Sequence, residues 1–582
     1  MRNVSPSCVL GAALSVAATP WVWAQAPTSA QVWLTRGDGQ SLLEQRLDVN
    51  FAAGAGNQAI KVNIDPTTTF QTIDGFGAAI TESSAWLLQT GIDASQRDQL
   101  MADLFSRDTG LGFSYVRVPM GASDFALSPY TYADVPTGQT DPTLSTFSVA
   151  RDDTYVVPTL QQAKALNPEL KLMASPWSPP AWMKTNGSLN GGSLKTEYYD
   201  AYAQYFVKFA EAYEQRGLPI ASVTPQNEPL NPTPNYPSMS MTTFEQSTFI
   251  GDHLGPAFQS ANLDIDILTF DHNWEDWNYP VIVANDLEAN PFVAGAAFHG
   301  YAGTVDQQSN FQSFFPDKQV HYTEITGFDP FNDFADNLAY AVGTSIIGAT
   351  RNWAESSIYW NLVLDPDGDP HLDGGCSTCR GMVTIDPDTG TITPEVEYYA
   401  YGHASKFVDP GAVRIASDTI DGVIETVAFK NPDGSEVLIA LNPGQMSRWF
   451  NVVREGESFQ YRLTSESVAT FVWEAAAALA LLGDYDGDGL VAQGDLNLVL
   501  SNWGSARGDW QNAEGFGSAV VQHGERSARE ASVRFLCCLC CKPASCPQLL
   551  LPKWLGHLWV CCFGRLAVQT TPSARLRLAC PG

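Results

Sequence analysis

Eight short apolar runs separated by helix-like segments constrain the fold of this 582-residue chain more than any other feature. A regular alternation of strands and helices predicts a parallel sheet, and eight consecutive units predict a closed (β/α)₈ barrel. The runs cover residues 73–80, 115–119, 170–175, 221–225, 265–270, 293–298, 319–323 and 357–362. The helix-like segments between them include residues 94–105, 157–166, 198–216, 243–261 and 332–350. We therefore predict the α/β fold class, with a barrel at residues 69–407.

The stretches on either side of the predicted barrel indicate a second module. Residues 408–475 break into short alternating runs, separated by turn signals at Asp421-Gly422, Pro432-Asp433-Gly434 and Asn442-Pro443-Gly444. Such a pattern predicts an antiparallel β-sandwich. Residues 27–68 contain similar short alternating pieces. We expect a single sandwich built from both chain ends, with the barrel inserted between them.

Two glutamates follow strand-like runs whose C-terminal ends should meet on one face of the barrel. Glu228 stands in the stretch Gln-Asn-Glu-Pro at residues 226–229, and Glu324 ends a later run. Retaining glycosidases need two carboxyl groups about 5–5.5 Å apart, one as acid/base and one as nucleophile. We interpret Glu228 as the acid/base, protonated because burial raises its pKa, and Glu324 as the nucleophile. Taken alone, Asn-Glu-Pro is equally consistent with a polar turn.

Other side chains near these strand ends each have a structural alternative. Trp177 is a candidate platform for a sugar ring, or a packing residue beneath a proline-rich loop. Arg117 is a candidate partner of a catalytic carboxylate, or a member of a structural ion pair. Asp124 either accepts hydrogen bonds from sugar hydroxyls or caps a loop. His299 is assigned to sugar binding or to the surrounding hydrogen-bond network, rather than to catalysis.

The N-terminus and the charge balance predict an exported protein. Arg2 precedes an apolar run at residues 8–18 and the small-residue pattern Ala24-Gln25-Ala26, which predicts a secretory signal at residues 1–26. The run is too short to span a bilayer. A net charge of −31, from 32 basic and 63 acidic residues, argues against nucleic-acid or anionic-membrane partners. We expect a secreted protein, extracellular or periplasmic, without integral membrane association.

The cysteines are unevenly distributed. Eight of the eleven lie from Cys537 onward, whereas Cys376 and Cys379 stand alone in the body of the chain. In an exported protein this pair predicts a local disulfide, with a zinc half-site or a redox pair as alternatives. The segment 516–582 has a basic balance and no periodic pattern. We interpret it as disordered or as a translation artefact, with a metal-binding or disulfide-rich tail as the alternative.

An acidic stretch at residues 482–505 has the spacing of a calcium-binding loop. Asp484, Asp486 and Asp488 occupy positions one, three and five, Gly489 occupies position six, and Asp495 occupies position twelve. Carboxylate oxygens at alternate positions and a glycine at the tight turn are typical of a calcium loop. We therefore predict a structural Ca²⁺ site here, with a flexible acidic linker as the alternative. The catalytic chemistry proposed above needs no cofactor.

Several motifs together resemble glycoside hydrolase family 30, the group of lysosomal glucosylceramidase. They lie, in order, at residues 73–79, 116–120, 174–187, 226–229 and 359–362. The resemblance implies a barrel with an attached sandwich, retaining hydrolysis of β-linked sugars, Glu228 as acid/base and Glu324 as nucleophile. It implies a sugar subsite lined by Arg117, Asp124, Trp177, Asn227, His299, Tyr301 and Trp360. The acidic loop resembles half of a dockerin, which implies a cohesin-type scaffold as partner.

Substrate choice within this resemblance stays open. The motifs lie nearest the glucosylceramidase type, so we predict first a secreted retaining β-glycosidase acting on β-glucosides. An endo-β-1,6-glucanase, or a β-xylanase or fucosidase, is the alternative, and a dockerin-like end favours polysaccharide. A non-catalytic carbohydrate-binding protein is a rival, but it would not need both Glu228 and Glu324. A calcium-dependent adhesion protein is a second rival, and it fits poorly with a chain that is mostly barrel.

Overall fold

A computed structural model of the chain describes residues 29–329, 333–474, 567–570 and 576–579. Residues Ala26–Ala475 belong to one compact unit, and the rest of the chain belongs to another. In the second unit, strands β24 (Ala567–Thr570) and β25 (Leu576–Ala579) form an antiparallel pair. The predicted signal at 1–26 and the predicted calcium loop at 482–505 lie outside the described residues. Among the described helices, none has the length and apolar character needed to cross a membrane.

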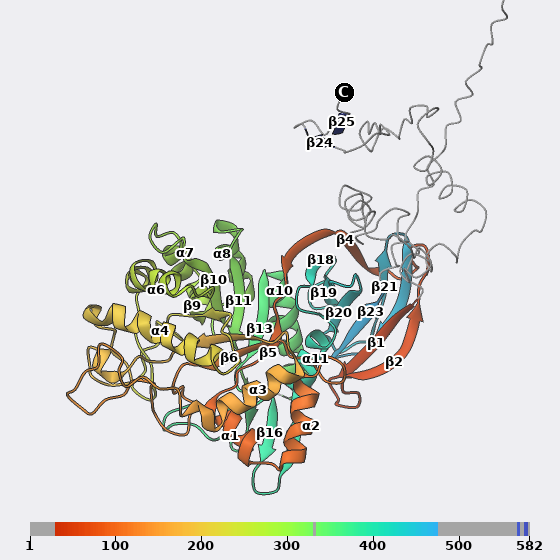
Figure 1. Ribbon diagram of the computed structural model, residues 1–582. Helices are drawn as coiled ribbons and strands as arrows, with labels where there is room; N and C mark the ends of the chain where they lie inside the picture. The colour runs from red at the N-terminus through yellow and green to blue at the C-terminus, as the bar shows by residue number, and fades with distance from the viewer. Residues whose placement is uncertain (1–28, 330–332, 475–566, 571–575, 580–582) are drawn as a thin grey trace, which may run out of the picture. The chain divides into compact units, whose positions relative to one another are not determined.

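Eight parallel strands form the predicted barrel (Figure 1). Their order around the sheet is β5-β13-β11-β10-β9-β8-β7-β6, and a parallel bridge between Ala79 and Arg117 closes β5 against β6. All eight predicted runs overlap one of these strands, so the predicted fold class is confirmed. The strands are β5 (Gly75–Ala78), β6 (Tyr115–Pro119), β7 (Lys171–Ser175), β8 (Ser222–Val223), β9 (Asp266–Asn273), β10 (Val293–His299), β11 (Gln319–Glu324) and β13 (Ala354–Tyr359).

Helices surround the barrel, and local capping sets where several of them begin. Asp93 and Thr242 each form a capping box at a helix start, and Thr81 caps another helix with its hydroxyl. The helices are α1 (Glu82–Thr90), α2 (Ala94–Phe105), α3 (Val156–Leu166), α4 (Tyr199–Glu214), α5 (Thr243–Thr248), α6 (Gly255–Ala261), α7 (Asn278–Ala284), α8 (Gln308–Phe314), α9 (Phe334–Tyr340), α10 (Ala349–Arg351) and α11 (Val396–Ser405).

Two of the predicted helices contain π-helical segments. The segment Phe249–Leu254 joins α5 to α6, and Ala341–Gly348 joins α9 to α10. Gly251 lies in the first segment and Gly255 directly follows it. A Cβ on Gly251 would come within 2.7 Å of Glu288, and a Cβ on Gly255 within 2.2 Å of Phe292, both in the turn after α7. The wider helical turn therefore accompanies close packing against a neighbouring segment.

Both ends of the unit contribute strands to the sandwich, as predicted. One ten-stranded sheet contains β1–β4 from the N-terminal side and β18–β23 from beyond the barrel. Its pairs are antiparallel except that β4 runs parallel to β21. The strands are β1 (Ser29–Arg36), β2 (Glu44–Asn50), β3 (Ala52–Ala53), β4 (Ile60–Thr72), β18 (Val413–Ser417), β19 (Glu425–Lys430), β20 (Glu436–Asn442), β21 (Arg448–Arg454), β22 (Glu457–Leu463) and β23 (Ser467–Trp473).

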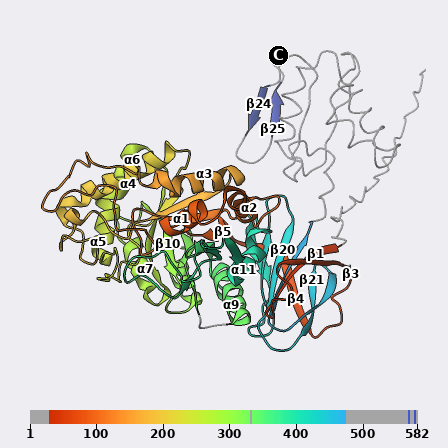
Figure 2. The ribbon, with the colours of Figure 1, turned by 90° about the horizontal axis from the view of Figure 1, so that it is seen from below.

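Helix α11 joins the barrel to the sandwich (Figure 2). Its buried His403 forms 2.8 Å hydrogen bonds with Thr470 of β23 and Thr35 of β1. Burial lowers the pKa of His403 to about 3, so the ring is neutral and its two nitrogens bond two hydroxyls. Strands β1 and β23, which lie on either side of the barrel in the sequence, are thus bonded to the same helix.

Candidate active site

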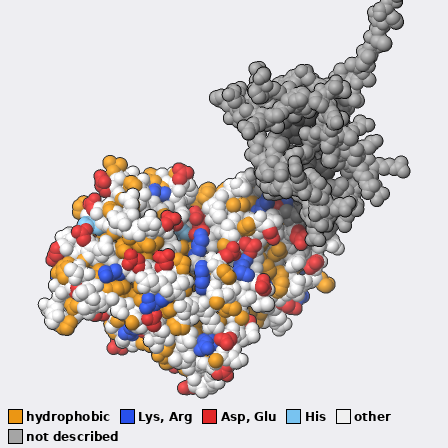
Figure 3. All heavy atoms as spheres, in the orientation of Figure 1, with side chains coloured by type: hydrophobic (Ala, Val, Ile, Leu, Met, Phe, Trp, Pro, Cys, Tyr) orange, Lys and Arg blue, Asp and Glu red, His pale blue; other side chains and the backbone are white. Residues whose placement is uncertain are grey.

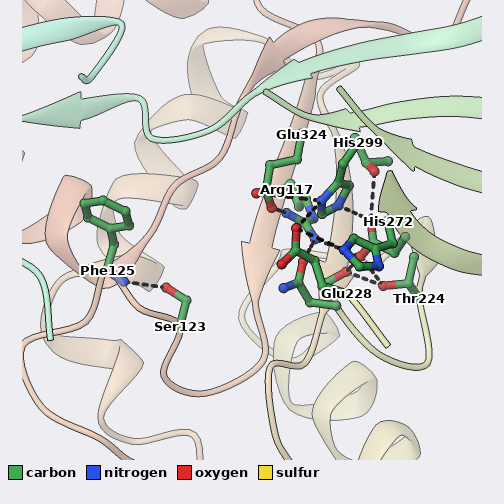
Figure 4. A network of polar contacts seen from close by, with 12 residues as sticks. Arg117, Ser123, Phe125, Thr224, Glu228, His272, His299 and Glu324 are labelled. Atoms are coloured by element: carbon green, nitrogen blue, oxygen red, sulfur yellow. Dashed lines mark hydrogen bonds and ion pairs between the residues drawn. The ribbon is translucent and has the colours of Figure 1, made fainter. Parts of the chain in front are cut away.

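The C-terminal ends of the barrel strands bring the predicted residues into one cluster. Figure 4 shows Arg117, Glu228, His272, His299 and Glu324 pointing toward one another. Arg117 lies in β6, His299 ends β10, and Glu324 ends β11. The remaining predicted residues follow a strand: Asp124 after β6, Trp177 after β7, Asn227 and Glu228 after β8, Tyr301 after β10 and Trp360 after β13.

The two predicted catalytic carboxylates lie close together. A carboxylate oxygen of Glu228, a ring nitrogen of His299 and a carboxylate oxygen of Glu324 lie within 4.8 Å of one another. Glu228 has a left-handed backbone with φ of +46°, an uncommon conformation for a residue with a side chain. Its carboxylate accepts a 2.8 Å hydrogen bond from Asn231. The separation of the two carboxylates is shorter than the roughly 6.5–9.5 Å of an inverting pair and suits a retaining mechanism.

Arg117 holds Glu324, the candidate nucleophile, in place. Its fully buried guanidinium donates to Glu324 Oε2, and also to Asn227 Oδ1 and Asp271 Oδ2 at 2.7 Å each. Tyr301 donates its hydroxyl to the other oxygen of Glu324 at 2.9 Å. Both oxygens of Glu324 therefore have a donor, and the planar guanidinium fixes the carboxylate in one orientation.

Asp271, in β9, is a functional residue that the sequence analysis did not select. It accepts hydrogen bonds from Ser175, Thr224 and Thr323 as well as from Arg117 and His299. Burial opposes its ionisation, but Arg117 and His299 hold its pKa far below the ordinary value. An Asp-His pair at the end of an apolar run was a sequence signal for this position, although no motif marked it.

The position of the catalytic proton differs from the prediction that Glu228 is protonated. Burial raises the pKa of Glu228, but the 3.1 Å hydrogen bond from His299 Nδ1 and the neighbouring His272 outweigh burial and lower it to about 2. Burial lowers the pKa of His299, but the charge of Glu324 and the bonds to Asp271 and Glu228 raise it to about 9. Burial also raises the pKa of Glu324. The prediction that Glu228 carries its own proton in the free protein was wrong, because His299 holds it.

A buried aromatic wall stands beside the carboxylates. Trp177 and Trp360 stack with ring centroids 5.0 Å apart, and the Arg117 guanidinium lies 4.9 Å from the Trp177 ring. Phe125 meets Trp360 edge-on at 6.1 Å. The carboxyl of Asp124 is buried, and burial together with the charge of Glu324 raises its pKa well above the ordinary value. The wall combines apolar ring faces with a polar group, a lining that suits a sugar.

The predicted disulfide is present, whereas the predicted calcium site cannot be placed. Cys376 and Cys379 are joined by a disulfide with an S–S distance of 2.09 Å, and both contact the cluster that contains Trp360. Among the described residues, two groups have the spacing of metal ligands, namely Glu228 with His299 and Glu324, and Asp74 with His321 and Glu355. The four predicted calcium ligands Asp484, Asp486, Asp488 and Asp495 lie outside the part of the chain that the structure describes.

Comparison with known proteins agrees with this geometry. Residues 73–408 match the glycosyl hydrolase family 30 TIM-barrel domain, and residues 411–471 match the beta sandwich domain of the same family. An endo-1,6-β-D-glucanase of Aspergillus fumigatus is 34% identical over 454 residues, covering 73% of this chain and 90% of the relative. The lysosomal acid glucosylceramidase of Mus musculus is 31% identical over 433 residues, covering 68% and 81%. A solved endo-β1,6-glucanase has a TM-score of 0.70 at 33% identity, covering 77% of this chain and 99% of that chain.

Proposed function

Because the chain belongs to glycosyl hydrolase family 30, a family of retaining glycoside hydrolases, we propose that it hydrolyses β-1,6-linked glucan by endo action. The close approach of the Glu228 and Glu324 carboxylates is the observation that carries the reaction type. The similarity to endo-1,6-β-glucanases in both sequence and structure supports the substrate. It favours the alternative substrate of the sequence analysis over the glucosylceramide type, whose mouse representative covers less of the chain.

In the first step, Glu324 attacks the anomeric carbon of the bound sugar while the glycosidic oxygen receives a proton from Glu228. The carbon–oxygen bond to the leaving sugar breaks, and a covalent glycosyl ester forms on Glu324. Asn227 accepts from Arg117 through its oxygen, so its amide N–H groups are directed to the sugar. A hydrogen bond to the 2-hydroxyl would strengthen as positive charge develops on the ring.

His299 supplies the proton that Glu228 delivers. In the free enzyme this proton is on His299, which is 3.1 Å from Glu228 Oε1. It passes along this bond as the glycosidic oxygen arrives beside Glu228. Ester formation removes the negative charge of Glu324, which contributes most to the raised pKa of His299. Glu228 then takes a proton from a water whose oxygen attacks the anomeric carbon, the bond to Glu324 breaks, and the sugar is released with net retention. Glu228 returns this proton to His299, which restores the free enzyme.

We test the substrate by comparing kcat/KM on linear β-1,6-glucan, β-1,4-xylan and glucosylceramide. The expected result is turnover of β-1,6-glucan with internal cleavage, seen as a rapid fall in polymer length. The anomeric configuration of the first product, followed by NMR, should be β. Preference for glucosylceramide would refute the proposed substrate, and an α product would refute the retaining mechanism.

We also propose that the enzyme acts after export. The Cys376–Cys379 disulfide supports this location, because disulfides persist in oxidising compartments. On the face drawn in Figure 3, acidic and basic side chains are interspersed over the described residues. Such a surface fits an uncharged glucan better than a polyanion. Detection of the protein in culture medium, with its N-terminus near residue 27, would test export.

A further inference from the structure

The catalytic glutamates divide the ring of barrel strands into two unequal arcs. Going one way, from Glu324 on β11 to Glu228 after β8, the ring passes through β10 and β9. Going the other way, it passes through β13, β5, β6 and β7, where Trp360 and Trp177 are 3% and 2% exposed. The longer arc is thus the closed wall for the sugar that Glu324 attacks. The shorter arc is therefore the side left for the leaving part of the substrate.

Two partly exposed aromatic rings lie near Glu324, where the shorter arc begins. Tyr301 and Phe328 are 36% and 37% exposed, and their ring centroids are 6.4 Å apart. The hydroxyl of Tyr301 donates a hydrogen bond to Glu324. The partly exposed ring of Tyr301 therefore lies next to the nucleophile. Phe328 follows Glu324 by four positions, on the short strand β12 (Gly327–Phe328). Together the rings continue the site outward from the nucleophile.

The backbone of Phe328 is paired in a short sheet although its ring is partly exposed. Strand β12 pairs antiparallel with β15 (Cys379–Arg380), and Cys379 is bonded to Cys376. Arg380 bridges Asp329 at 2.5 Å and the buried Glu397 at 2.6 Å. An exposed aromatic side chain on a fixed backbone loses little conformational entropy when a ligand stacks on it, which favours a binding role.

We propose that Tyr301 and Phe328 form the subsite for the leaving-group glucosyl unit of a β-linked glucan. The proposal rests on the proposed function, and it adds a specificity residue, Phe328, that no motif marks. Stacking of a pyranose on these ring faces positions the glycosidic oxygen beside Glu228. The pairing of β12 with β15, and the disulfide of Cys379, fix the position of the Phe328 ring. The subsite contributes only when the leaving group is a sugar.

Two substrates with the same glycosyl part separate this role from a general structural one. Linear β-1,6-glucan has a sugar leaving group, whereas β-gentiobiosyl fluoride has a fluoride that fills no sugar subsite. Phe328→Ala should lower kcat/KM on the glucan about tenfold and leave the fluoride unchanged, since remote binding energy serves catalysis only when the remote group is present. Phe328→Tyr retains a ring and should keep both activities.

Trp449→Ala is the matched control, because Trp449 is an exposed aromatic residue on strand β21 of the sandwich. It should change neither activity. Equal losses on both substrates, or no loss on the glucan, would overturn the subsite while leaving the proposed function intact. A wild-type enzyme inactive on both substrates would refute the proposed function itself.

Discussion

The barrel carries two carboxylate–histidine clusters of similar geometry at its opposite ends. At the C-terminal strand ends, Glu228, His299 and Glu324 offer ligand atoms within 4.8 Å of one another. At the N-terminal ends, Asp74, His321 and Glu355 meet the same criterion. Only the first cluster has the features of an active site, so the clustering of acidic and histidine side chains does not by itself identify one.

The surroundings of the clusters explain the difference. The buried Arg117 bonds Glu324 in the first cluster, and Glu228 and Asp271 have left-handed backbones there. In the second cluster the charge is balanced locally, because Lys171 pairs with Asp74 at 2.6 Å. The buried ring of His321 bonds Ser356 and Gln319, at 2.8 and 3.1 Å. A cation fixed beneath the nucleophile, strained backbone and an aromatic wall together distinguish the catalytic end.

The largest expected effect comes from the catalytic cluster. Glu324→Gln should lower kcat on β-1,6-glucan by on the order of 10⁴-fold or more, because the amide cannot form the glycosyl ester. Glu228→Gln should cause a comparable loss on the glucan, since its sugar leaving group needs a proton. Azide should restore turnover to the Glu228 variant better than to the Glu324 variant. Wild-type rates in either variant would remove the assignment.

Arg117→Lys is expected to have the next largest effect. The lysine keeps the positive charge but loses the planar group that bonds Glu324, Asn227 and Asp271 together. We expect kcat to fall about 10²-fold, as when one preorganised donor is removed. Lys171→Arg at the other end of the barrel is the matched control, and it should retain activity. Equal losses of kcat in the two variants would contradict the assignment of catalysis to the C-terminal end of the barrel.

The pH profile tests the location of the proton. With a pKa raised to about 9, His299 should set an alkaline limb of kcat/KM near pH 9, since activity is lost when this proton leaves. His299→Asn removes the cation between Glu228 and Glu324. The two carboxylates then share a single proton, which they hold more weakly than His299 does. The alkaline limb should move to lower pH, along with a fall in kcat. An unchanged limb would show that another group holds the proton.

The smallest effect on activity is expected at the N-terminal end of the barrel. Burial and the charge of Asp74 raise the pKa of Glu355 from 4.5 to about 8. Because the folded-state pKa lies above the unfolded value, its stabilising contribution is complete below pH 4.5 and is lost as pH rises through 8. Glu355→Gln should therefore increase the free energy of unfolding at pH 8 by on the order of 4 kcal/mol, with kcat unchanged. Denaturant unfolding at pH 4 and pH 8 measures this difference, and a destabilised or inactive variant would contradict it.

The sequence predicted well those helices and strands whose limits are set by residues within or next to the segment. The prediction for residues 115–119 matches β6 at both ends, because every side chain of this strand is buried, Ser114 precedes it and Pro119 ends it. The prediction for residues 94–105 matches α2, whose capping box at Asp93 is visible in the sequence. The π-helical segment Phe249–Leu254 was not predicted, because it depends on packing against residues outside the helix.

Within the candidate site, positions were predictable but charge states were not. Glu228 and Glu324 could be selected because barrel topology brings strand ends together. Asp271 stands beside His272 at the end of an apolar run, but its role depends on its left-handed backbone and on donors from four other strands. The low pKa of Glu228 depends on which neighbour carries the proton. Whether burial or hydrogen bonding decides the pKa of Glu228 depends on the position of His299 in the folded protein, which the sequence does not give.

Trapping the covalent intermediate tests most directly whether the two glutamates act as a nucleophile and acid/base pair. A 2-deoxy-2-fluoro-β-gentiobiosyl fluoride should inactivate the enzyme and leave one glycosyl group attached, because the fluorine slows hydrolysis of the ester. Peptide mapping by mass spectrometry should find the sugar on Glu324 in the wild type and no label in Glu324→Gln. A label on any other residue, or continued turnover without a trapped ester, would contradict the account.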